Sequence, residues 1–397
     1  MRKNMDIVRE FDQKRILIWG YGREGKATEA FLKRCCSPLS IEIFEGSRDE
    51  IDEDLYDLII KSPGIIMEED HPKYTSQTEI FLRAFSKNVI GITGTKGKST
   101  TSAMLYHVLK KFPGRDAILL GNIGEPCLNH YEEVKEDTIV VFEMSCHQLA
   151  HLSVSPHIAV FLNLFEEHLD YYGTFEKYKA AKCNITKYQT PEDILYVGEM
   201  LTDLPTDARK IVVPFPEREY DLKILGEHNH YNAEFVFRIA TQLGMDEQTV
   251  LESLKTFEGL SHRLQFLGVK SGISYYDDSI STIPEATISA LCAVKNAKTV
   301  LIGGMDRGIN YDILVDFVRK NPQYTYIFMY ESGRRIYDLV KTCAYCKYCE
   351  DLKGAVELAG NVTKEGHACI LSPAAASYGY FKNFEERGDK FREYAGL

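Results

Sequence analysis

Short apolar runs and amphipathic stretches alternate along almost the whole chain. The apolar runs are rich in Ile, Leu and Val, as buried strands are, and the stretches between them have helical spacing. This alternation predicts an α/β fold in which helices cover mainly parallel sheets. The expected strands are 15–19, 41–44, 57–61, 89–93, 138–143, 158–163, 194–197, 273–278, 299–304, 324–329 and 368–373.

The same pattern falls into three blocks, and 397 residues are enough for two or three domains. The first block ends at about residue 87, and the second begins with the apolar run 89–93. The third begins near Gly259, after an amphipathic stretch at 249–257. We therefore expect domains at residues 1–87, 88–259 and 260–397.

The apolar run 89–93 leads into a glycine-rich turn and then into a helical pattern. Glycines let backbone N–H groups turn toward an anion, and the following helix adds the positive end of its dipole. Lys98 can reach the terminal phosphates of a nucleotide, while a hydroxyl of Ser99 or Thr100 can hold Mg²⁺. The loop is tighter than the usual G-x4-G-K-[ST] pattern, because Ile92 stands where that pattern begins with glycine. The predicted ATP loop consists of Gly94, Thr95, Lys96, Gly97, Lys98, Ser99 and Thr100.

A second glycine-rich loop follows the strand 15–19 and has the form G-x-G-x-x-G, with Gly20, Gly22 and Gly25 at its fixed positions. A helical pattern comes next, and Glu45 ends the following strand, where an acid can bind a ribose hydroxyl. From these residues alone, NAD would be the first choice of ligand. The pattern reports only a phosphate at a helix N-terminus, however, so any nucleotide diphosphate would fit, and a turn without a ligand also remains open.

The composition is that of an intracellular enzyme. A net charge of −11 without an extended basic run argues against a nucleic-acid partner. The first residues are polar and charged, which predicts no signal peptide, and no apolar run approaches membrane-spanning length. Ten cysteines are expected as reduced thiols. Cys343, Cys346 and Cys349 have metal-site spacing but lack an evident fourth ligand, so we interpret them as ordinary thiols.

Further polar residues stand at the ends of predicted strands, where α/β proteins place their ligands. Glu143 ends one strand, and an acid next to a phosphate loop can hold Mg²⁺. His168 follows another strand, although a single His is often only a hydrogen-bonded loop residue. Asn229 and Asn232 lie on one face at the start of a predicted helix, and asparagine can read the donor–acceptor edge of adenine.

Seven segments together resemble the Mur ligases of peptidoglycan synthesis, over essentially the whole chain. They read GTKGKST, EMSCHQL, NLFEEHLD, GEHNHYN, SHRLQ, DDS and LSPAAASYGYFKNFEERGDKF. The last segment resembles the branch that adds glutamate to UDP-N-acetylmuramoyl-L-alanine. The resemblance implies three domains: a Rossmann-like domain for the sugar nucleotide, a central P-loop ATPase domain, and a Rossmann-like domain for the amino acid. It also implies a ligase that acts in the cytoplasm as a monomer, with small-molecule substrates and no nucleic-acid or membrane partner.

The family's chemistry then implies ATP and two Mg²⁺ ions. Ser99 and Glu143 would hold one ion, and His168 would bind a second. Lys182 matches a lysine that the family carbamylates with CO₂, which would turn a cation into an anion able to face Mg²⁺. Without the family, Lys182 would be a lysine on a helix surface. The residues implied as catalytic are Lys98, His168, Lys182 and Arg263.

The resemblance also assigns the remaining substrate contacts. For ATP it adds Asn229, Asn232, Arg263 and Asp278 to the phosphate loop. For the sugar nucleotide it implies Gly20, Tyr21, Gly22, Gly25, Glu45, Ser62, Gly64 and Asn122. For glutamate it implies Thr282, Arg307, Ser377 and Phe384, the last through its backbone N–H.

The chain departs from the family at the amino-acid pocket. Ile280 stands where a lysine is expected, and Arg307 replaces another lysine. Arg307 can grip a carboxylate bidentately, so a dicarboxylate substrate is retained. We expect D-glutamate, with L-glutamate as the alternative. Two other functions remain as alternatives. An NAD-dependent oxidoreductase is favoured only by the Gly20–Gly25 loop. A non-catalytic ATP-binding protein would be expected to have lost catalytic positions.

Overall fold

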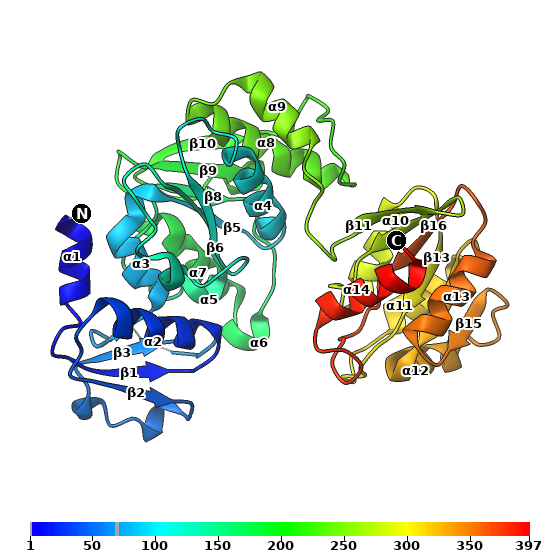
Figure 1. The fold of residues 1–397 in the computed structure, drawn as a ribbon, viewed down its shortest axis with the longest axis horizontal. Coiled ribbons are helices and arrows are strands. Elements are labelled where there is room, and N and C mark those ends of the chain that lie inside the picture. Colours follow the sequence, from blue (N-terminus) through cyan, green and yellow to red (C-terminus); the bar gives the residue numbers. More distant parts are fainter. Residues whose placement is uncertain (1, 68–70) are drawn as a thin grey trace. The chain divides into compact units, whose positions relative to one another are not determined.

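The computed structural model describes residues 2–67 and 71–397, which form three sheets with helices on their faces (Figure 1). The contacts divide the chain into two compact units. The first unit comprises residues 1–221 and 228–257, and the second comprises residues 222–227 and 258–397. The alternation of strands and helices confirms the predicted α/β class. Among the described residues, no helix is both long enough and apolar enough to span a membrane.

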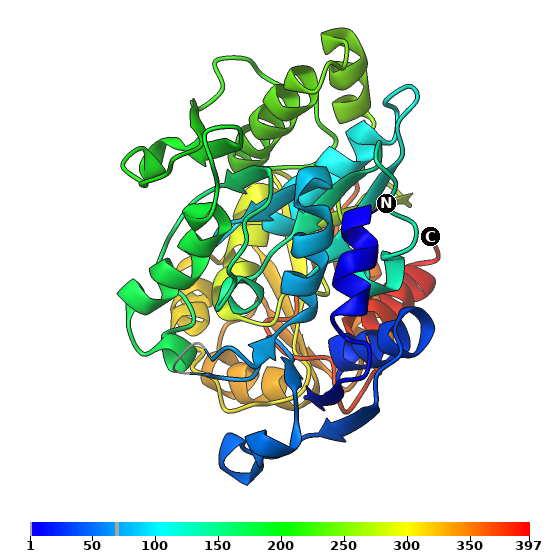
Figure 2. The same ribbon diagram turned by 90° about the vertical axis from the view of Figure 1, so that its left-hand side faces the viewer.

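The first sheet has the strand order β2-β1-β3-β4, and its pairings are parallel. Because β1 lies between β2 and β3, the loop after β1 stands at a topological switch point, where α/β sheets bind ligands. α1 lies alongside α3 (Figure 2). The elements are α1 (Arg2–Arg9), β1 (Arg15–Trp19), α2 (Arg23–Cys35), β2 (Ser40–Phe44), β3 (Leu58–Lys61), β4 (Tyr74–Thr75) and α3 (Gln77–Phe85).

The second sheet has the order β10-β9-β8-β5-β7-β6 and is also parallel. β5 lies between β8 and β7, so the loop after it again stands at a switch point. Its strands are β5 (Val89–Thr93), β6 (Ala117–Gly121), β7 (Ile139–Glu143), β8 (Ile158–Phe161), β9 (Ile194–Gly198) and β10 (Arg209–Val213). Its helices are α4 (Lys98–Leu109), α5 (Cys146–Leu149), α6 (Leu169–Tyr172), α7 (Phe175–Lys187), α8 (Glu227–Gln242) and α9 (Glu247–Lys255).

A single apolar core continues from the first sheet to the second. Phe31 of α2 packs on Tyr131 with ring centroids 4.8 Å apart, and Phe85 of α3 packs on the same ring at 4.9 Å. Phe81 of α3 meets Phe142 of β7 at 5.9 Å. Buried aromatic pairs of this kind add stability beyond the area they bury. The first two sheets therefore form one unit by contact, and the boundaries at residues 87 and 259 stay predictions.

The third sheet has the order β11-β12-β16-β13-β14-β15 and is mixed. β11 pairs antiparallel with β12, and the other pairings are parallel. Ser271 and Gly272 join β11 to β12 with φ angles of 50° and 74°, the left-handed pair that a two-residue hairpin needs. The elements are β11 (Gln265–Lys270), β12 (Ile273–Asp277), α10 (Pro284–Ala293), β13 (Ala297–Ile302), α11 (Asp312–Lys320), β14 (Thr325–Met329), α12 (Tyr330–Val340), β15 (Cys346–Cys349), α13 (Leu352–Val362), β16 (Ala368–Leu371) and α14 (Phe384–Ala395).

Candidate active site

The turn after β5 has the geometry of a phosphate loop. Gly97 adopts φ 86° at the N-cap of α4, and a Cβ there would lie 2.8 Å from Oδ1 of Asn232. Glycine is thus required both by the left-handed backbone and by the close approach of α8. Asn163, after β8, holds the loop by accepting hydrogen bonds from the N–H groups of Thr95 and Lys96 at 3.1 and 2.8 Å. Sequence reasoning placed Asn163 at a strand end but gave it no role.

Two lysines lie on the carbonyl side of this loop. Lys98 donates to the carbonyl oxygens of Gly94 and Thr95, both at 2.9 Å. Lys182 of α7 donates to the same Gly94 carbonyl at 2.8 Å and is 1% exposed. The interpretation of Lys182 as a surface lysine, which the residues alone suggested, is therefore wrong. Burial lowers the pKa of both amines, and the nearby Lys98 charge contributes to bringing the pKa of Lys182 to about 7.

Glu143, at the end of β7, is fully buried. Its Oε1 accepts a hydrogen bond from Nδ2 of Asn122 at 2.9 Å, while Oε2 has no hydrogen-bond partner among the described residues. A buried carboxylate oxygen without a partner is costly, and a bound cation would satisfy it. The donor set is also the one that Mg²⁺ prefers, since it consists of oxygen.

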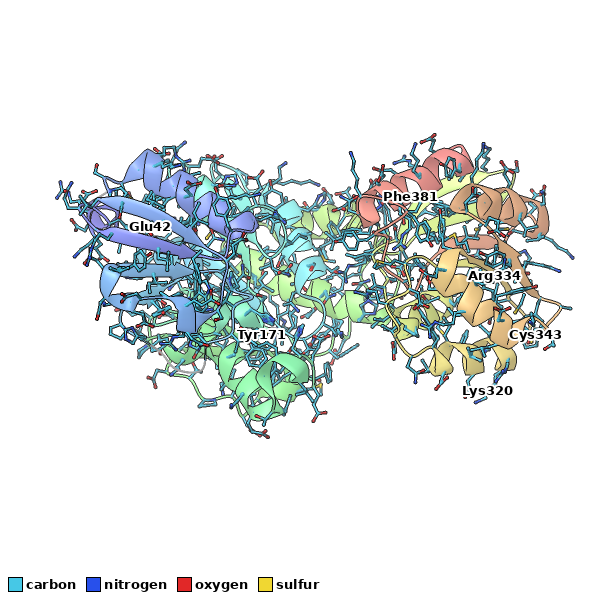
Figure 3. All side chains as sticks on the ribbon, turned by 90° about the horizontal axis from the view of Figure 1, so that it is seen from below. Glu42, Tyr171, Lys320, Arg334, Cys343 and Phe381 are labelled. Carbon is cyan, nitrogen blue, oxygen red and sulfur yellow. The ribbon has the colours of Figure 1, made fainter. Side chains whose placement is uncertain are left out.

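His168 opens the short helix α6 with a left-handed φ of 56°. Such a backbone is uncommon for residues other than glycine, although histidine adopts it more often than most, and it is often found at functional sites. The ring of His168 lies 5.1 Å from the ring of His147, which in turn stacks on Tyr171 at 4.3 Å. Tyr171, labelled in Figure 3, donates to the carbonyl of Ile65 at 3.1 Å and so ties α6 to the turn after β3.

A cavity of about 690 Å³ brings both glycine loops together inside the first unit. On one side it is lined by most of the residues predicted for the sugar nucleotide, namely Gly20, Tyr21, Gly22, Glu45, Ser62, Gly64 and Asn122. On the other side it is lined by the predicted catalytic residues Lys98, His168 and Lys182. Residues predicted for the two ligands therefore line one open cavity.

The remaining predicted residues of the first unit lie near this cavity without lining it. A Cβ on Gly25 would come within 2.2 Å of the Gly20 carbonyl oxygen, so Gly25 is needed for the close approach of α2 to its own loop. Asn229 and Asn232 lie on one face of α8, joined by a 3.1 Å hydrogen bond, as predicted. Asn232 also contacts the phosphate loop through the approach to Gly97 described above.

The second unit holds the other predicted residues, at the carboxyl edge of the third sheet. The Asp278 carboxylate accepts hydrogen bonds from the N–H of Leu264 at 3.1 Å and from the hydroxyls of Ser281 and Ser372 at 2.5 and 2.8 Å. Burial raises the pKa of Asp278 to about 6. The adjacent Arg263 is exposed. Asp278 thus supports the segment that carries Arg263, and its contact with ATP stays a prediction.

Three loops of the predicted glutamate pocket are bonded to one another. The fully buried Arg387 donates to the backbone carbonyls of Ser279 and Ala375 at 2.7 and 3.0 Å. Ser279 donates to the Phe384 carbonyl at 2.8 Å. Met305 pairs with Ala376, which brings the Arg307 loop beside the Ser377 loop. Sequence reasoning missed Arg387, although it lies within the FKNFEERGDKF segment that carries the resemblance.

The predicted glutamate residues differ in exposure. Ser377 is buried, Thr282 and Phe384 are half-buried, and Arg307 is exposed. Cys343 (labelled in Figure 3), Cys346 and Cys349 are free thiols on and before β15. No group of three or more His, Cys, Asp or Glu side chains suited to a metal ion occurs in the described part of the chain.

Comparison with known proteins agrees with this geometry. The Mur ligase middle domain model matches residues 92–202, the segment that contains the phosphate loop, Glu143, His168 and Lys182. The UDP-N-acetylmuramoylalanine–D-glutamate ligase of Aquifex aeolicus is 34% identical over 96% of this chain and 98% of its own. The ligase of the same name from Streptococcus mutans is 32% identical over 98% of each chain.

Solved structures of Mur ligases share the fold. The UDP-N-acetylmuramate–alanine ligase MurC of Thermotoga maritima has a TM-score of 0.61 at 20% identity, over 96% of this chain and 98% of its own. The MurF ligase of the same organism, solved in complex with ADP, has a TM-score of 0.61 at 17% identity over 98% of each chain. At 17–20% identity, these structures show only the fold. The curated relatives, at 32–34% identity, show the branch of the family to which the chain belongs. The chain belongs to the Mur ligases, in the branch whose curated members are named UDP-N-acetylmuramoylalanine–D-glutamate ligase (MurD), and it is a ligase of peptidoglycan synthesis.

Proposed function

We propose that this chain joins D-glutamate to UDP-N-acetylmuramoyl-L-alanine and hydrolyses ATP to ADP and phosphate in the process. The observation that carries the proposal is the cavity of about 690 Å³ with the sugar-nucleotide loop on one side and Lys98, His168 and Lys182 on the other. A ligase that activates one substrate with the phosphate of another needs both in one cavity. The same observation supports UDP rather than NAD as the ligand of the Gly20–Gly25 loop.

The chemistry follows from the low reactivity of a carboxylate toward an amine. The alanyl carboxylate would attack the γ-phosphorus of ATP, giving an acyl phosphate and ADP. The glutamate amine would then attack the acyl carbon and lose a proton, and phosphate would leave from the tetrahedral intermediate. Phosphoryl transfer requires mainly positioning and charge neutralisation, which a lysine-rich cavity supplies.

Lys98 is the residue that we assign to the β- and γ-phosphates. Its amine bridges the carbonyls of Gly94 and Thr95, at the start of α4. An incoming phosphate would offer the amine an anionic acceptor in place of two neutral carbonyls, and hydrogen bonds between charged partners are the stronger kind. The positive end of the α4 dipole favours the same anion.

The residues around the phosphate loop fit Mg²⁺. Glu143 has an unpartnered buried oxygen, and Ser99 supplies a hydroxyl at the start of α4, so these two residues would hold one ion. His168, with Lys182 once it is carbamylated, would hold a second. Mg²⁺ bound there would neutralise the charge that accumulates when a phosphate and a carboxylate approach each other.

Carbamylation of Lys182 is supported by its surroundings. CO₂ reacts with a neutral amine, and an ordinary lysine is almost fully protonated near neutral pH. Burial and the neighbouring Lys98 lower the pKa of Lys182 to about 7, so a large part of the amine is neutral at that pH. The modification would replace a second buried cation beside Lys98 by an anion, which removes their repulsion.

Recognition of glutamate is assigned to the carboxyl edge of the third sheet. Arg307 is exposed there, and its loop lies beside the buried Ser377. Ile280, which carries no charge, leaves Arg307 as the cation for one glutamate carboxylate. We propose the D form because the Thr282, Ser377 and Phe384 types expected for this branch are retained.

The test is phosphate release from ATP with UDP-N-acetylmuramoyl-L-alanine and each glutamate enantiomer in turn. We expect release that depends on the sugar nucleotide and is faster with D-glutamate. A higher kcat/KM with L-glutamate would overturn the stereochemical assignment but keep the ligase. ATP turnover that ignores the sugar nucleotide would refute the substrate. The same preparation, run through a sizing column, tests the expectation that the enzyme acts as a monomer, and cell fractionation tests its place in the cytoplasm.

A further inference from the structure

The first turn of α2 contacts two loops of the central sheet. Nη2 of Arg23 donates to the carbonyl of Gly124, in the loop after β6, at 2.7 Å. Oε1 of Glu24 accepts from Nε2 of Gln148, in α5 after β7, at 2.9 Å. Arg23 and Glu24 occupy the two free positions between the second and third glycines of the G-x-G-x-x-G loop. The loop therefore uses its non-glycine positions to reach the part of the chain around Glu143.

The side chain of Gln148 can meet Glu24 in only one orientation. Its Oε1 accepts from the backbone N–H of Ser145 at 3.0 Å and from the Ser145 hydroxyl at 3.1 Å. Gln148 is 3% exposed, so its Nε2 has no alternative partner in water. Ser145 returns the contact by capping the Gln148 N–H, which closes a reciprocal capping box. Glu24 is thus bonded, through Gln148, to a residue that stands two positions after Glu143.

Glu24 is an unfavourable residue for merely holding a phosphate. Its Oε2 is buried, and burial raises the pKa of the carboxyl group, although Gln77, Gln148 and the buried Lys61 favour the charged form. Its charge also stands in the first turn of α2, where it would oppose the phosphates of a sugar nucleotide. Glu24, Ser145 and Gln148 all line the cavity that both loops share. These facts indicate that Glu24 serves the connection between the loops rather than the binding of either ligand.

We propose that Glu24 and Gln148 are positioning residues that couple the occupancy of the sugar-nucleotide loop to the arrangement of Glu143 and Ser145 on the ATP side. The inference rests on the proposed function, because it takes Gly20–Gly25 as the sugar-nucleotide loop. A ligand that orders the start of α2 fixes the Glu24 acceptor, and this holds Gln148 and its capping box in place. The second ligand then binds to a segment that is already ordered, which gives positive coupling between the two sites.

The experiment measures that coupling in the full chain. Calorimetry gives the Kd of UDP-N-acetylmuramoyl-L-alanine with and without a saturating Mg²⁺ complex of a non-hydrolysable ATP analogue. We expect the analogue to tighten binding in the unmodified protein by about 5- to 150-fold, the usual range for coupled sites. Glu24→Ala and Gln148→Ala should each bring this factor close to one while both ligands still bind singly. The double variant should lose nothing more, because both residues act through one contact.

Two conservative variants and one control make the test specific. Glu24→Gln keeps an oxygen acceptor and should keep the coupling, whereas Glu24→Leu fills the site without an acceptor and should abolish it. Glu24→Leu leaves the buried Nε2 of Gln148 without its acceptor, so the thermal unfolding of each variant is compared with that of the unmodified protein to show that it is folded. Glu79→Ala is the matched control, since Glu79 also joins the first sheet's helix α3 to the central sheet's Ser153 but lies outside the cavity.

The outcomes separate the two proposals. If both ligands bind and turnover occurs, but Glu24→Ala and Glu24→Leu leave the coupling factor unchanged, this inference is wrong and the proposed function stands. The same conclusion follows if Glu79→Ala abolishes coupling as fully as Glu24→Ala does. A protein that binds the ATP analogue but not the sugar nucleotide would remove the proposed function, and the inference with it.

Discussion

The two glycine loops of the first unit differ in the charged side chains that lie beside them. Beside the second loop, the half-buried Lys98 and the buried Lys182 donate to the carbonyls of Gly94 and Thr95, and the acids Glu143 and Glu167 lie close to Lys98. The first loop itself carries the exposed Arg23 and the acid Glu24, which interacts with the buried Lys61, and Glu45 lines the same cavity. Both loops follow a central strand of a parallel sheet and precede a helix, so backbone geometry alone does not distinguish them.

This difference in charged side chains corresponds to the two roles that we propose, anchoring a diphosphate at the first loop and phosphoryl transfer at the second. A loop that only anchors a diphosphate needs backbone N–H groups and a helix dipole, which both loops have. A loop at which phosphoryl transfer occurs must also neutralise charge that develops during the reaction, and buried cations do this without reorganising. Under the proposed function, the lysines bonded to the second loop correspond to phosphoryl transfer there, and their absence from the first loop, among the described residues, corresponds to anchoring.

The largest effect should come from removing the cation of the transferring loop. Lys98→Ala is expected to lower kcat by about 10²-fold or more, as loss of a transition-state charge partner does. Lys110→Ala, at the other end of α4, is the control and should be nearly neutral. Steady-state phosphate release measures both. Near-normal turnover of purified Lys98→Ala would show that the two loops do not differ in the way described.

The second test concerns the lysine that we expect to be modified. Lys182→Ala should be almost inactive, with a loss also on the order of 10²-fold, because an anion facing Mg²⁺ is removed. Short carboxylic acids such as acetate should restore part of the activity by standing in for the carbamate. Mass spectrometry under CO₂ gives an independent measurement. A fully active, Mg²⁺-bound enzyme with an unmodified Lys182 amine would contradict the assignment.

A third anion, the glutamate carboxylate, extends the comparison to the second unit. Arg307→Met should raise the apparent KM for glutamate by about ten-fold to more than a hundred-fold, since a charge-assisted bidentate pair contributes roughly 1.5–3 kcal/mol. The KM for ATP should change little. Lys320→Met, on α11 of the same unit, serves as the control. An unchanged KM for glutamate would mean that another residue binds the carboxylate.

The smallest effect should come from the anchoring loop. Glu45→Ala should raise the KM for the sugar nucleotide by about ten-fold, the loss of one charge-assisted hydrogen bond, and leave ATP affinity unaltered. Gly22→Val sharpens the test, because a Cβ on Gly22 would meet nothing within 4 Å and Gly22 lines the cavity, so the added side chain is expected to obstruct the sugar nucleotide. Equal loss of affinity for both ligands would show that the two loops are wrongly assigned.

Much of the fold could be predicted from the sequence, because parallel strands buried on both faces leave continuous apolar runs. The strand β5, the loop after it and α4 lie where the pattern placed them. β11 was not predicted, since it is an antiparallel edge strand with exposed Phe266 and Val269 and has no buried run to reveal it. β6 and β10, at the two edges of the central sheet, were also not predicted, because both strands are partly exposed.

The contacts of the charged side chains in the site were harder to predict than the positions of its loops. Periodicity placed Lys182 on a helix but could not show that the helix turns this side chain inward to the Gly94 carbonyl. The junction of Glu24 with Gln148 joins residues 124 positions apart, and no local pattern reports such a contact. The contacts of Arg387 could not be predicted either, because its partners Ser279 and Ala375 lie in two other loops. The glycine motif pointed to the loop that holds Glu24, and the resemblance to a family pointed to Lys182 and to the segment of Arg387.

The shared apolar core of the first two sheets has a consequence for how this enzyme can change over time. Phe31, Phe81 and Phe85 pack against Tyr131 and Phe142 across what the sequence presents as a boundary at residue 87. A sugar-nucleotide module exchanged from another enzyme would have to bring matching aromatic partners with it. The shared core thus couples the stability of the two sheets that carry the glycine loops.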